Sequence, residues 1–361
     1  MTRPADIVAG QRAAPGSVRR AADQVKSSAY VGGESEMFMM RFDMRVPGKA
    51  PAEVAAQYQT AIEMAQWADD KGCTSIGVSE HHAAEDGYMA SPLVLATAMA
   101  AVTKKVPIIV GAALLPMYDP VRLAEDMIML DHVSRGRVTF ILGIGYRPLE
   151  YELYGLDYSQ RGAIADTKLT RLLEVLRQAS DALTMPRVTP PPFTPGRPSI
   201  AWGGATKAAA RRAGRNGLGF FAQTNTPGLA ETYAAAALEA GFKPGHCILP
   251  SPEMPGAVFV HPNPDQGWQE VGSYLLADAV SYAEWNKNAG RPTVRLSQGR
   301  TIAELRAERA AHHVVNAAEA VEITKRWGRL PLHPLCGGIP PELAWSYLRR
   351  VVDDVLPNLT R

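Results

Sequence analysis

A Glu-His-His run contains three side chains that are able to exchange protons. Glu80, His81 and His82 directly follow a short apolar segment, Thr74 to Val78, which is predicted to be a buried strand. A histidine at the end of such a strand can exchange protons near neutral pH, and a neighbouring glutamate can support it. The alternative is that both histidines are merely hydrogen-bonded structural groups, and the spacing alone does not separate the two.

The histidine spacing argues against a metal site. Adjacent residues of a strand point to opposite sides, so His81 and His82 do not easily ligate one ion. The pair His312-His313 has the same geometry, and His333 stands alone in the sequence. We therefore expect no catalytic metal.

A glycine-rich turn is the second group. Gly203, Gly204, Ala205 and Thr206 lie between a predicted strand and a predicted helix, where free amides and the helix dipole attract an anion such as a phosphate. Arg147, which follows the fourth predicted strand, is the natural cationic partner. The alternatives are a plain strand–helix turn and, for the arginine, a surface ion pair with Glu150.

A nicotinamide-binding domain is not recognisable. The segment Gly143-Ile144-Gly145-Tyr146-Arg147-Pro148 begins like a dinucleotide fingerprint, but it lacks the third glycine and has a proline where the helix should open. No Walker lysine pattern occurs. If reduced cofactor is needed, another protein is expected to supply it.

Predicted strands and predicted helices alternate along the chain. This alternation predicts parallel strands joined by right-handed crossovers, and eight strands favour a closed barrel over an open sheet. We therefore predict a single α/β domain, a (β/α)8 barrel, with its chemistry at the carboxyl ends of the strands. The predicted strands cover 38–46, 74–78, 106–113, 138–144, 199–202, 219–222, 257–261 and 330–335.

Composition is that of an ordinary globular protein. The chain has 361 residues, a net charge of +2 and interspersed charges, so neither nucleic acid nor an anionic membrane is an expected partner. Three distant cysteines indicate a reducing compartment, and a cytoplasmic location is expected. No apolar run is long enough to span a bilayer. Residues 1–36 are predicted to form a flexible extension, and residues 37–361 the barrel domain.

Together these segments resemble the bacterial-luciferase-like family of flavin-dependent monooxygenases and oxidoreductases. The resemblance covers about Phe38 to Leu356 and depends on five pieces that occur in the family's order. The pieces are Ser79-Glu80-His81-His82, residues 119–126 (DPVRLAED), residues 130–137 (LDHVSRGR), Gly143 to Arg147 with Glu150-Tyr151 and Tyr154-Gly155, and Gly203 to Thr206 with Arg211-Arg212-Ala213.

The resemblance implies a flavin lying across the barrel mouth. It places His81 near the reactive part of the ring, with Glu80 and His82 supporting it. It implies that the phosphate is held by the turn at Gly203, Gly204, Ala205 and Thr206 and by Arg147. The remaining cofactor-binding residues that it implies are Phe42, Asp43, Ala112, Ala113, Leu114, Gly145 and Tyr146.

The same resemblance implies a monooxygenase that uses reduced FMN and dioxygen on a small organic substrate, with a separate flavin reductase. Glycine-rich phosphate turns also occur in relatives that use a deazaflavin coenzyme for hydride transfer, so that alternative stays open. A non-catalytic flavin-binding subunit is a further alternative. The segments 186–198 and 290–300 are candidate covers of the site, and the apolar helices Pro92–Thr103 and Pro120–Leu130 predict a homodimer.

Overall fold

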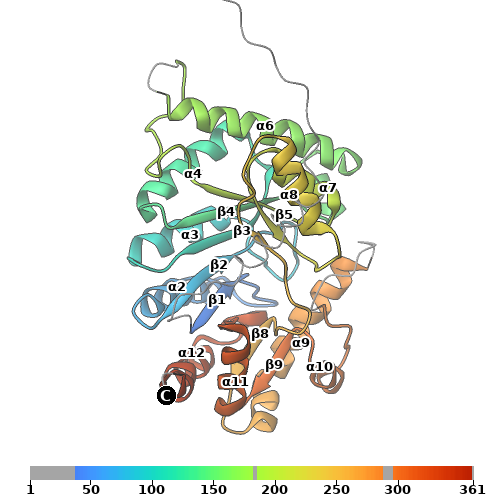
Figure 1. The fold of residues 1–361 in the computed structure, drawn as a ribbon. Helices are drawn as coiled ribbons and strands as arrows, with labels where there is room; N and C mark the ends of the chain where they lie inside the picture. The colour runs from blue at the N-terminus through green and yellow to red at the C-terminus, as the bar shows by residue number, and fades with distance from the viewer. Residues whose placement is uncertain (1–36, 182–184, 288–295, 360–361) are drawn as a thin grey trace, which may run out of the picture.

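A curled sheet of eight parallel strands is the centre of the fold in the computed structural model, which describes residues 37–181, 185–287 and 296–359 (Figure 1). The strands are hydrogen-bonded in the order β10-β1-β2-β3-β4-β5-β6-β7. Their bounds are β1 Phe38–Phe42, β2 Cys73–Val78, β3 Ile108–Leu114, β4 Val138–Gly143, β5 Ser199–Gly204, β6 Gly219–Ala222, β7 Cys247–Ile248 and β10 Leu330–Leu332. A second, two-stranded parallel sheet joins β8 (Ala257–Val260) to β9 (His312–Val315), and β8 packs against β10. The predicted α/β barrel class is confirmed.

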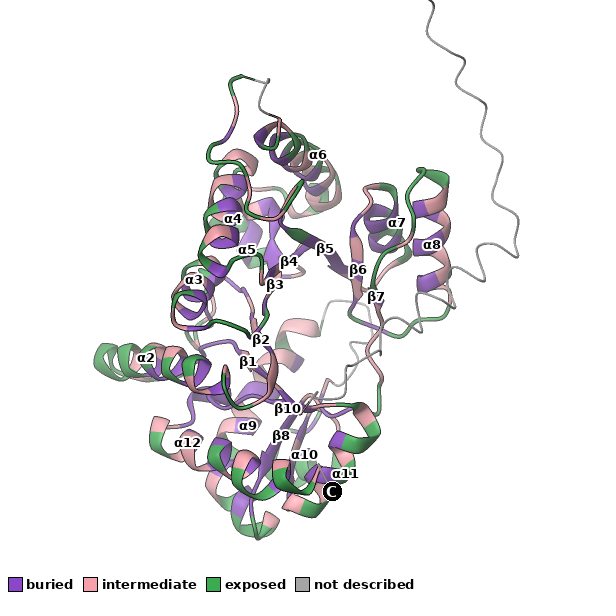
Figure 2. Cartoon of the chain, turned by 60° about the vertical axis from the view of Figure 1, so that its left-hand side comes forward, coloured by how far each residue is buried: buried purple, intermediate pink, exposed green. Residues whose placement is uncertain are grey.

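Helices connect the strands and cover the outside of the sheet, with their buried faces turned toward it (Figure 2). Six of them begin with a proline in their first turn, where the missing N–H costs nothing. The helices are α2 Pro51–Ala68, α3 Pro92–Val102, α4 Pro120–Ser134, α5 Pro148–Leu153, α6 Arg161–Ala179, α7 Lys207–Arg215, α8 Leu229–Glu239, α9 Pro264–Asn286, α10 Ile302–Glu308, α11 Ala317–Trp327 and α12 Pro341–Arg350.

The strand assignment differs from the sequence prediction at β7, β8 and β9, and neither β7 nor β9 was predicted as a strand. Seven of the eight predicted strands belong to the eight-stranded sheet, but the segment predicted as 257–261 is β8, which pairs with β9. The eighth position in the large sheet is taken by β7, which has only two residues. A two-residue strand is too short for its side-chain pattern to be seen in sequence, which explains the omission.

One predicted cover of the site lies on the wrong side of the barrel. Residues 186–198 precede β5, so they lie at the amino end of the strands, and Thr194 donates from both its amide and its hydroxyl to Asp131 near the end of α4. The ring of His132 also contacts the carbonyl of Pro191. Because the predicted chemistry is at the carboxyl ends, this loop does not cover it, and that prediction was wrong. Of the other candidate cover, 290–300, residues 290–295 lie outside the described residues, as does the predicted extension 1–36.

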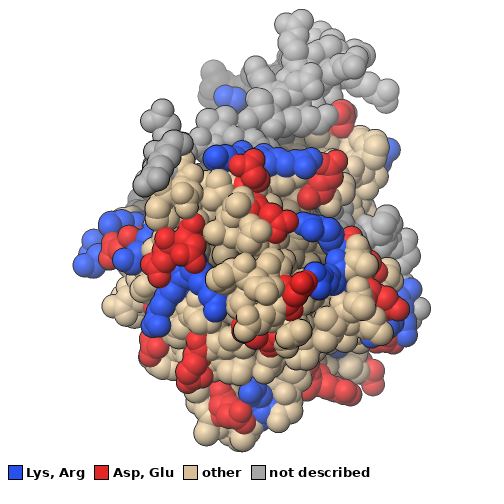
Figure 3. All heavy atoms as spheres, turned by 90° about the horizontal axis from the view of Figure 1, so that it is seen from below, with Lys and Arg blue, Asp and Glu red and all other residues tan. Residues whose placement is uncertain are grey.

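Positive and negative side chains are mixed on the face of the molecule that is seen from below. On this face Lys and Arg side chains alternate with Asp and Glu (Figure 3). Among the described residues, no helix has both the length and the apolar character needed to cross a membrane.

Candidate functional site

The Glu80-His81-His82 run and the glycine-rich turn lie at the same rim of the sheet. The run follows the carboxyl end of β2, and the turn includes the carboxyl end of β5, where Gly203 and Gly204 are the last strand residues. Since all strands of this sheet are parallel, their carboxyl ends meet on one side. This is the side on which barrel enzymes carry their active sites.

A buried carboxylate orients His81. Its Nδ1 lies 2.7 Å from Oε1 of Glu150, a residue of α5 with no exposed surface. A carboxylate only accepts hydrogen bonds, so Nδ1 carries the proton and Nε2 is the basic nitrogen. The hydroxyl of Tyr146 lies 3.3 Å from Nε2 and can donate to it. The structure therefore holds one basic imidazole nitrogen in a fixed direction.

Glu80 and His82 form a second pair beside the first. Nε2 of His82 lies 2.6 Å from Oε1 of Glu80, and Oε2 of Glu80 accepts from the amide of Leu114 and the hydroxyl of Tyr118. Burial, together with the Glu80 charge, raises the pKa of Tyr118, so that hydroxyl remains a donor. Glu80 thus ties the end of β2 to the end of β3.

Arg147 points toward the histidine run and contacts its backbone. Its guanidinium donates to the carbonyl oxygens of His82 (2.5 Å) and Ala83 (3.3 Å), and Nη1 lies 3.5 Å from Oε1 of Glu150. It also lies over the ring of Trp285, 4.1 Å from the ring centre. The ion pair with Glu150 considered from sequence therefore exists, but it is buried rather than on the surface.

An aromatic wall surrounds the imidazole of His81. The rings of Tyr88, Tyr146 and Trp285 meet it edge-on, with centroids 4.9, 5.2 and 4.9 Å away. Burial raises the pKa of Tyr146, which keeps its hydroxyl protonated. Trp285 belongs to the last turn of α9, far from His81 in sequence. Neither Glu150 as a partner of His81 nor Trp285 was predicted, and only the short spacing from Arg147 to Glu150 could have signalled the former.

Small residues form a strip along the rim between β3, β4 and β5. A Cβ added at Gly143 would lie 3.2 Å from Cβ of Ala112, and one added at Gly203 would lie 3.1 Å from a methyl of Ile141. Any larger side chain at these two positions would fill the strip. Close packing at the ends of β3, β4 and β5 therefore leaves little room for a side chain at either glycine.

The turn after β5 has the geometry of an anion site. Thr206 caps α7 by accepting from the amide of Ala209, so the amides of Lys207 and Ala208, at the first two helical positions, have no acceptor within the helix. Gly204 has φ +153°, and a Cβ there would lie 2.7 Å from Cβ of Ala209. The glycine is thus required by the turn itself.

Phe42 and Asp43 lie at the carboxyl end of β1, beside the end of β2. Phe42 is fully buried in the core, and Asp43 belongs to a charged network with Arg45 and His333 rather than to the His81 group. Ala113 and Leu114 are buried at the end of β3, and Ala112 contributes to the strip. Gly145 is close to Glu150, since a Cβ there would lie 3.4 Å from its Oε2.

The sequence profile described as luciferase-like monooxygenase matches residues 39–329. The chain belongs to this family. Among curated proteins similar to it, a 4-hydroxyprotoasukamycin monooxygenase of Streptomyces nodosus subsp. asukaensis is 32% identical over 27% of this chain and 26% of its own length. An alkanal monooxygenase alpha chain of Photorhabdus luminescens is 30% identical over 29% of each chain. The matched segments therefore span less than a third of these luciferase-like relatives.

Solved structures support the same fold over nearly the whole domain. A monooxygenase from Streptomyces bottropensis has a TM-score of 0.64 at 22% identity, covering 89% of this chain and 99% of its own. The oxygenating constituent of 3,6-diketocamphane monooxygenase from Pseudomonas putida, in complex with FMN, has a TM-score of 0.61 at 17% identity, covering 90% and 99%. An F420-dependent secondary alcohol dehydrogenase has a TM-score of 0.56 at 16% identity, covering 85% and 98%.

Proposed function

We propose that the protein is a monooxygenase that uses reduced FMN and dioxygen to oxygenate a small organic substrate. The observation that carries the proposal is the common rim: the oriented, basic Nε2 of His81 and the free amides at the start of α7 face the same side of one parallel sheet. A cofactor with a ring and a phosphate needs both groups, because His81 would lie beside the ring and the amides would bind the phosphate.

The residues present fit FMN. The ring would lie beside the small residues Ala112, Gly143 and Gly203 at the ends of β3, β4 and β5, and the amides of Lys207 and Ala208 would hold the phosphate. When bound in its reduced form, FMN supplies the electrons that reduce dioxygen, one oxygen atom going to the substrate and the other to water.

Each side chain of the site has an assigned task. His81 holds or moves a proton at Nε2, and Glu150 fixes the ring that does so. Glu80 and His82 keep the rims of β2 and β3 together, and the aromatic wall keeps water from the reacting atoms. Arg147 reaches the phosphate only if its guanidinium leaves the carbonyl of His82, so we assign it to phosphate binding after such a movement.

A deazaflavin coenzyme is the second candidate, because one structural neighbour is F420-dependent and F420 is a deazaflavin. In that case His81 would exchange a proton beside a hydride carrier, without dioxygen. The two candidates differ in whether oxygen is consumed. We further propose that reduced FMN comes from a separate reductase, since the failed dinucleotide fingerprint at Gly143 to Pro148 leaves no recognisable nicotinamide site.

Cofactor titration followed by oxygen uptake tests the proposal. The purified chain is titrated with reduced FMN and with reduced F420 in separate anaerobic cells, and each complex is then mixed with dioxygen and a panel of ketones, aldehydes and aromatic compounds. We expect saturable FMN binding and oxygen-dependent product. Binding of F420 alone would replace the monooxygenase by the hydride-transfer enzyme, and binding of neither would overturn both.

A homodimer through α3 and α4 is part of the proposal. Val94, Met129 and Val133 are large apolar side chains on these two neighbouring helices, and their exposed fractions are 72%, 54% and 37%. Exposed apolar side chains on two helices that pack together favour a protein partner over water.

A further inference from the structure

Four side chains that the proposed reaction does not use converge beside the aromatic wall. Asp278 lies on α9, His312 begins β9, His333 follows β10, and Cys336 begins the short turn Cys336–Gly338. Together they are called the Asp278 cluster here. One ligand atom each of Asp278, His333 and Cys336 lies within 4.8 Å of the other two. Nε2 of His312 lies 2.9 Å from Oδ2 of Asp278 and 3.9 Å from Sγ of Cys336.

The polar atoms of this cluster are deeply buried and incompletely paired. At most 2% of any of the four residues is exposed. Within the described part of the chain, Nδ1 of His333 and Oδ1 of Asp278 have no hydrogen-bond partner. Buried polar atoms are nearly always bonded, so these atoms indicate a group that they would bind.

A carboxylate lies beside the ring of His333. Its Nε2 lies 3.2 Å from Oδ1 of Asp43, a residue with no exposed surface. Among the described residues neither ring nitrogen of His333 has a hydrogen-bond partner, so the imidazole has a nitrogen available for an ion. Histidines that ligate metals commonly donate their second ring N–H to a carboxylate, and Asp43 is placed for that role.

The charges around the cluster leave room for a cation. Arg45 lies 3.4 Å from carboxylate oxygens of Asp43 and of Asp86, and 3.6 Å from one of Asp278. Arg41 is the second cation that faces the group. Three carboxylates therefore outnumber two guanidiniums by one. A divalent cation that displaces the thiol proton of Cys336 would bring the whole group to neutrality.

The state of the thiol agrees with this account. Burial, and after it the charges of Asp278 and Asp43, raise the pKa of Cys336 well above its usual range. Without a cation the thiol keeps its proton and is unreactive. A metal ion removes that proton on binding, because the thiolate is the ligand.

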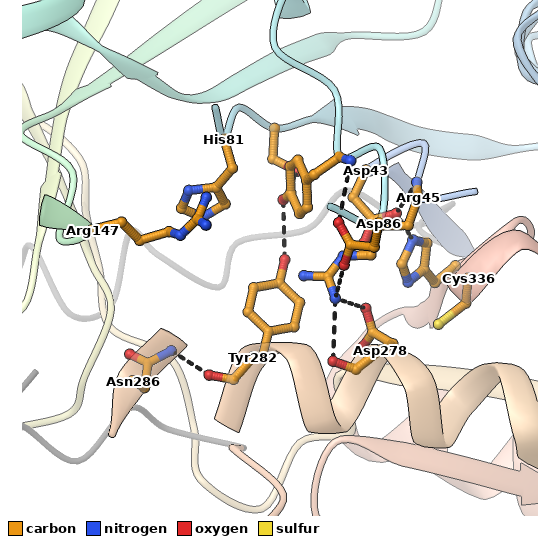
Figure 4. A network of polar contacts seen from close by, with 12 residues as sticks. Asp43, Arg45, His81, Asp86, Arg147, Asp278, Tyr282, Asn286 and Cys336 are labelled. Carbon is orange, nitrogen blue, oxygen red and sulfur yellow. Dashed lines mark hydrogen bonds and ion pairs between the residues drawn. The ribbon is translucent and has the colours of Figure 1, made fainter. Parts of the chain in front are cut away.

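We propose that Asp278, His333 and Cys336 bind one Zn²⁺ ion, and that His312 leaves its hydrogen bond with Asp278 to supply the fourth ligand. Sulfur, imidazole nitrogen and carboxylate oxygen in a set of four are the donors that zinc takes in a tetrahedral site. The four donors come from α9, β9 and the segment after β10, so the ion joins α9 to the strands. Figure 4 shows Asp278 and Tyr282 on the same helix, α9. Because α9 also carries Trp285, which packs on His81, the ion fixes the helix that closes the aromatic wall. The inference is independent of which cofactor the rim binds.

Metal content and cobalt spectroscopy test the proposal on the full chain. Protein stripped with a chelator is given Zn²⁺ or Co²⁺, dialysed, and its metal measured by mass spectrometry. We expect one ion per chain, a higher melting temperature, and with Co²⁺ the intense visible bands of a tetrahedral complex plus a thiolate charge-transfer band in the near ultraviolet. Failure of the wild-type chain to retain one equivalent, or a cobalt complex without the thiolate band, overturns the proposal.

Matched variants locate the ion. Cys336→Ser should lose the thiolate band and most of the bound zinc, and His333→Gln should lose zinc, whereas Cys73→Ser, on β2 outside the cluster, should keep both. Circular dichroism of each variant shows whether it is folded. Zinc retained at one equivalent in folded Cys336→Ser and His333→Gln would contradict the assignment. If either variant fails to fold, the wild-type stoichiometry and cobalt spectrum decide.

Discussion

Nδ1 of His81 lies 2.7 Å from Oε1 of Glu150, although 69 residues separate the two in sequence. The pairing fixes which nitrogen of the imidazole is basic, and it depends on α5, a helix of six residues that begins at Pro148. The same Oε1 also accepts from the amide of His82. One carboxylate therefore sets the positions of both histidines.

Glu150→Gln should lower turnover about tenfold or more, because the amide can donate to Nδ1 as well as accept from it and no longer selects one tautomer. His81→Ala should lower it by about 10²- to 10⁴-fold, the usual range for a lost general acid or base. The measurement is product formed per reduced flavin. Glu152→Gln, on the exposed side of α5, is the control. Wild-type turnover in Glu150→Gln at unchanged flavin affinity would remove Glu150 from the mechanism.

Gly204→Ala should weaken binding of FMN by about tenfold without affecting riboflavin, which lacks the phosphate. The substituted Cβ would lie 2.7 Å from Cβ of Ala209, so the turn must shift and its amides with it. The control is Gly196→Ala, which also has positive φ but faces open space. Fluorescence titration with both compounds gives the ratio of dissociation constants. An equal loss for FMN and riboflavin would mean that the turn does not hold the phosphate.

Positions that follow from a residue's place on a strand were predicted correctly. Glu80, His81 and the turn at Gly203 were placed at one rim because parallel strands bring their carboxyl ends together. Contacts that depend on packing between distant segments were not predicted. Nothing local indicates that Trp285 of α9 meets His81, or that His333, which stands alone in sequence, lies beside Asp43 and Cys336.

The assignment of residues 186–198 as a cover failed for a different reason. The composition of this segment does not tell which end of the barrel the loop occupies. That follows only from connectivity, since a loop entering a strand lies at the amino end. The contacts of Thr194 with Asp131 fix it there.

Asp69 should make folding stability depend on pH in the acid range. It accepts hydrogen bonds from the amides of Lys104, Lys105 and Val106. Burial acts to raise the pKa of Asp69, but these amides outweigh it and the pKa is lowered. The folded-state pKa is thus below the unfolded value of about 3.9. The contribution is present above that pH and is lost as the pH falls through the folded-state pKa.

Urea unfolding of the wild type and of Asp69→Asn between pH 7 and pH 3 measures this effect. The wild type should be the more stable protein at pH 7, and the difference should shrink below about pH 4. A difference that stays constant over the whole range would show that the charge on Asp69 contributes nothing.

Met129→Glu should convert the proposed homodimer into monomers. Met129 is 54% exposed on α4, next to Val133 and close to α3, and a charge buried there without a partner opposes association. Met185→Glu, an equally apolar and more exposed position (73%) on the loop before β5, should leave the dimer intact. Sedimentation velocity over a range of concentrations separates the two states. A wild-type chain that sediments only as a monomer would refute the dimer. A dimer that survives Met129→Glu would place its interface on another face. The apolar residues of α3 and α4 would then pack only within their own chain.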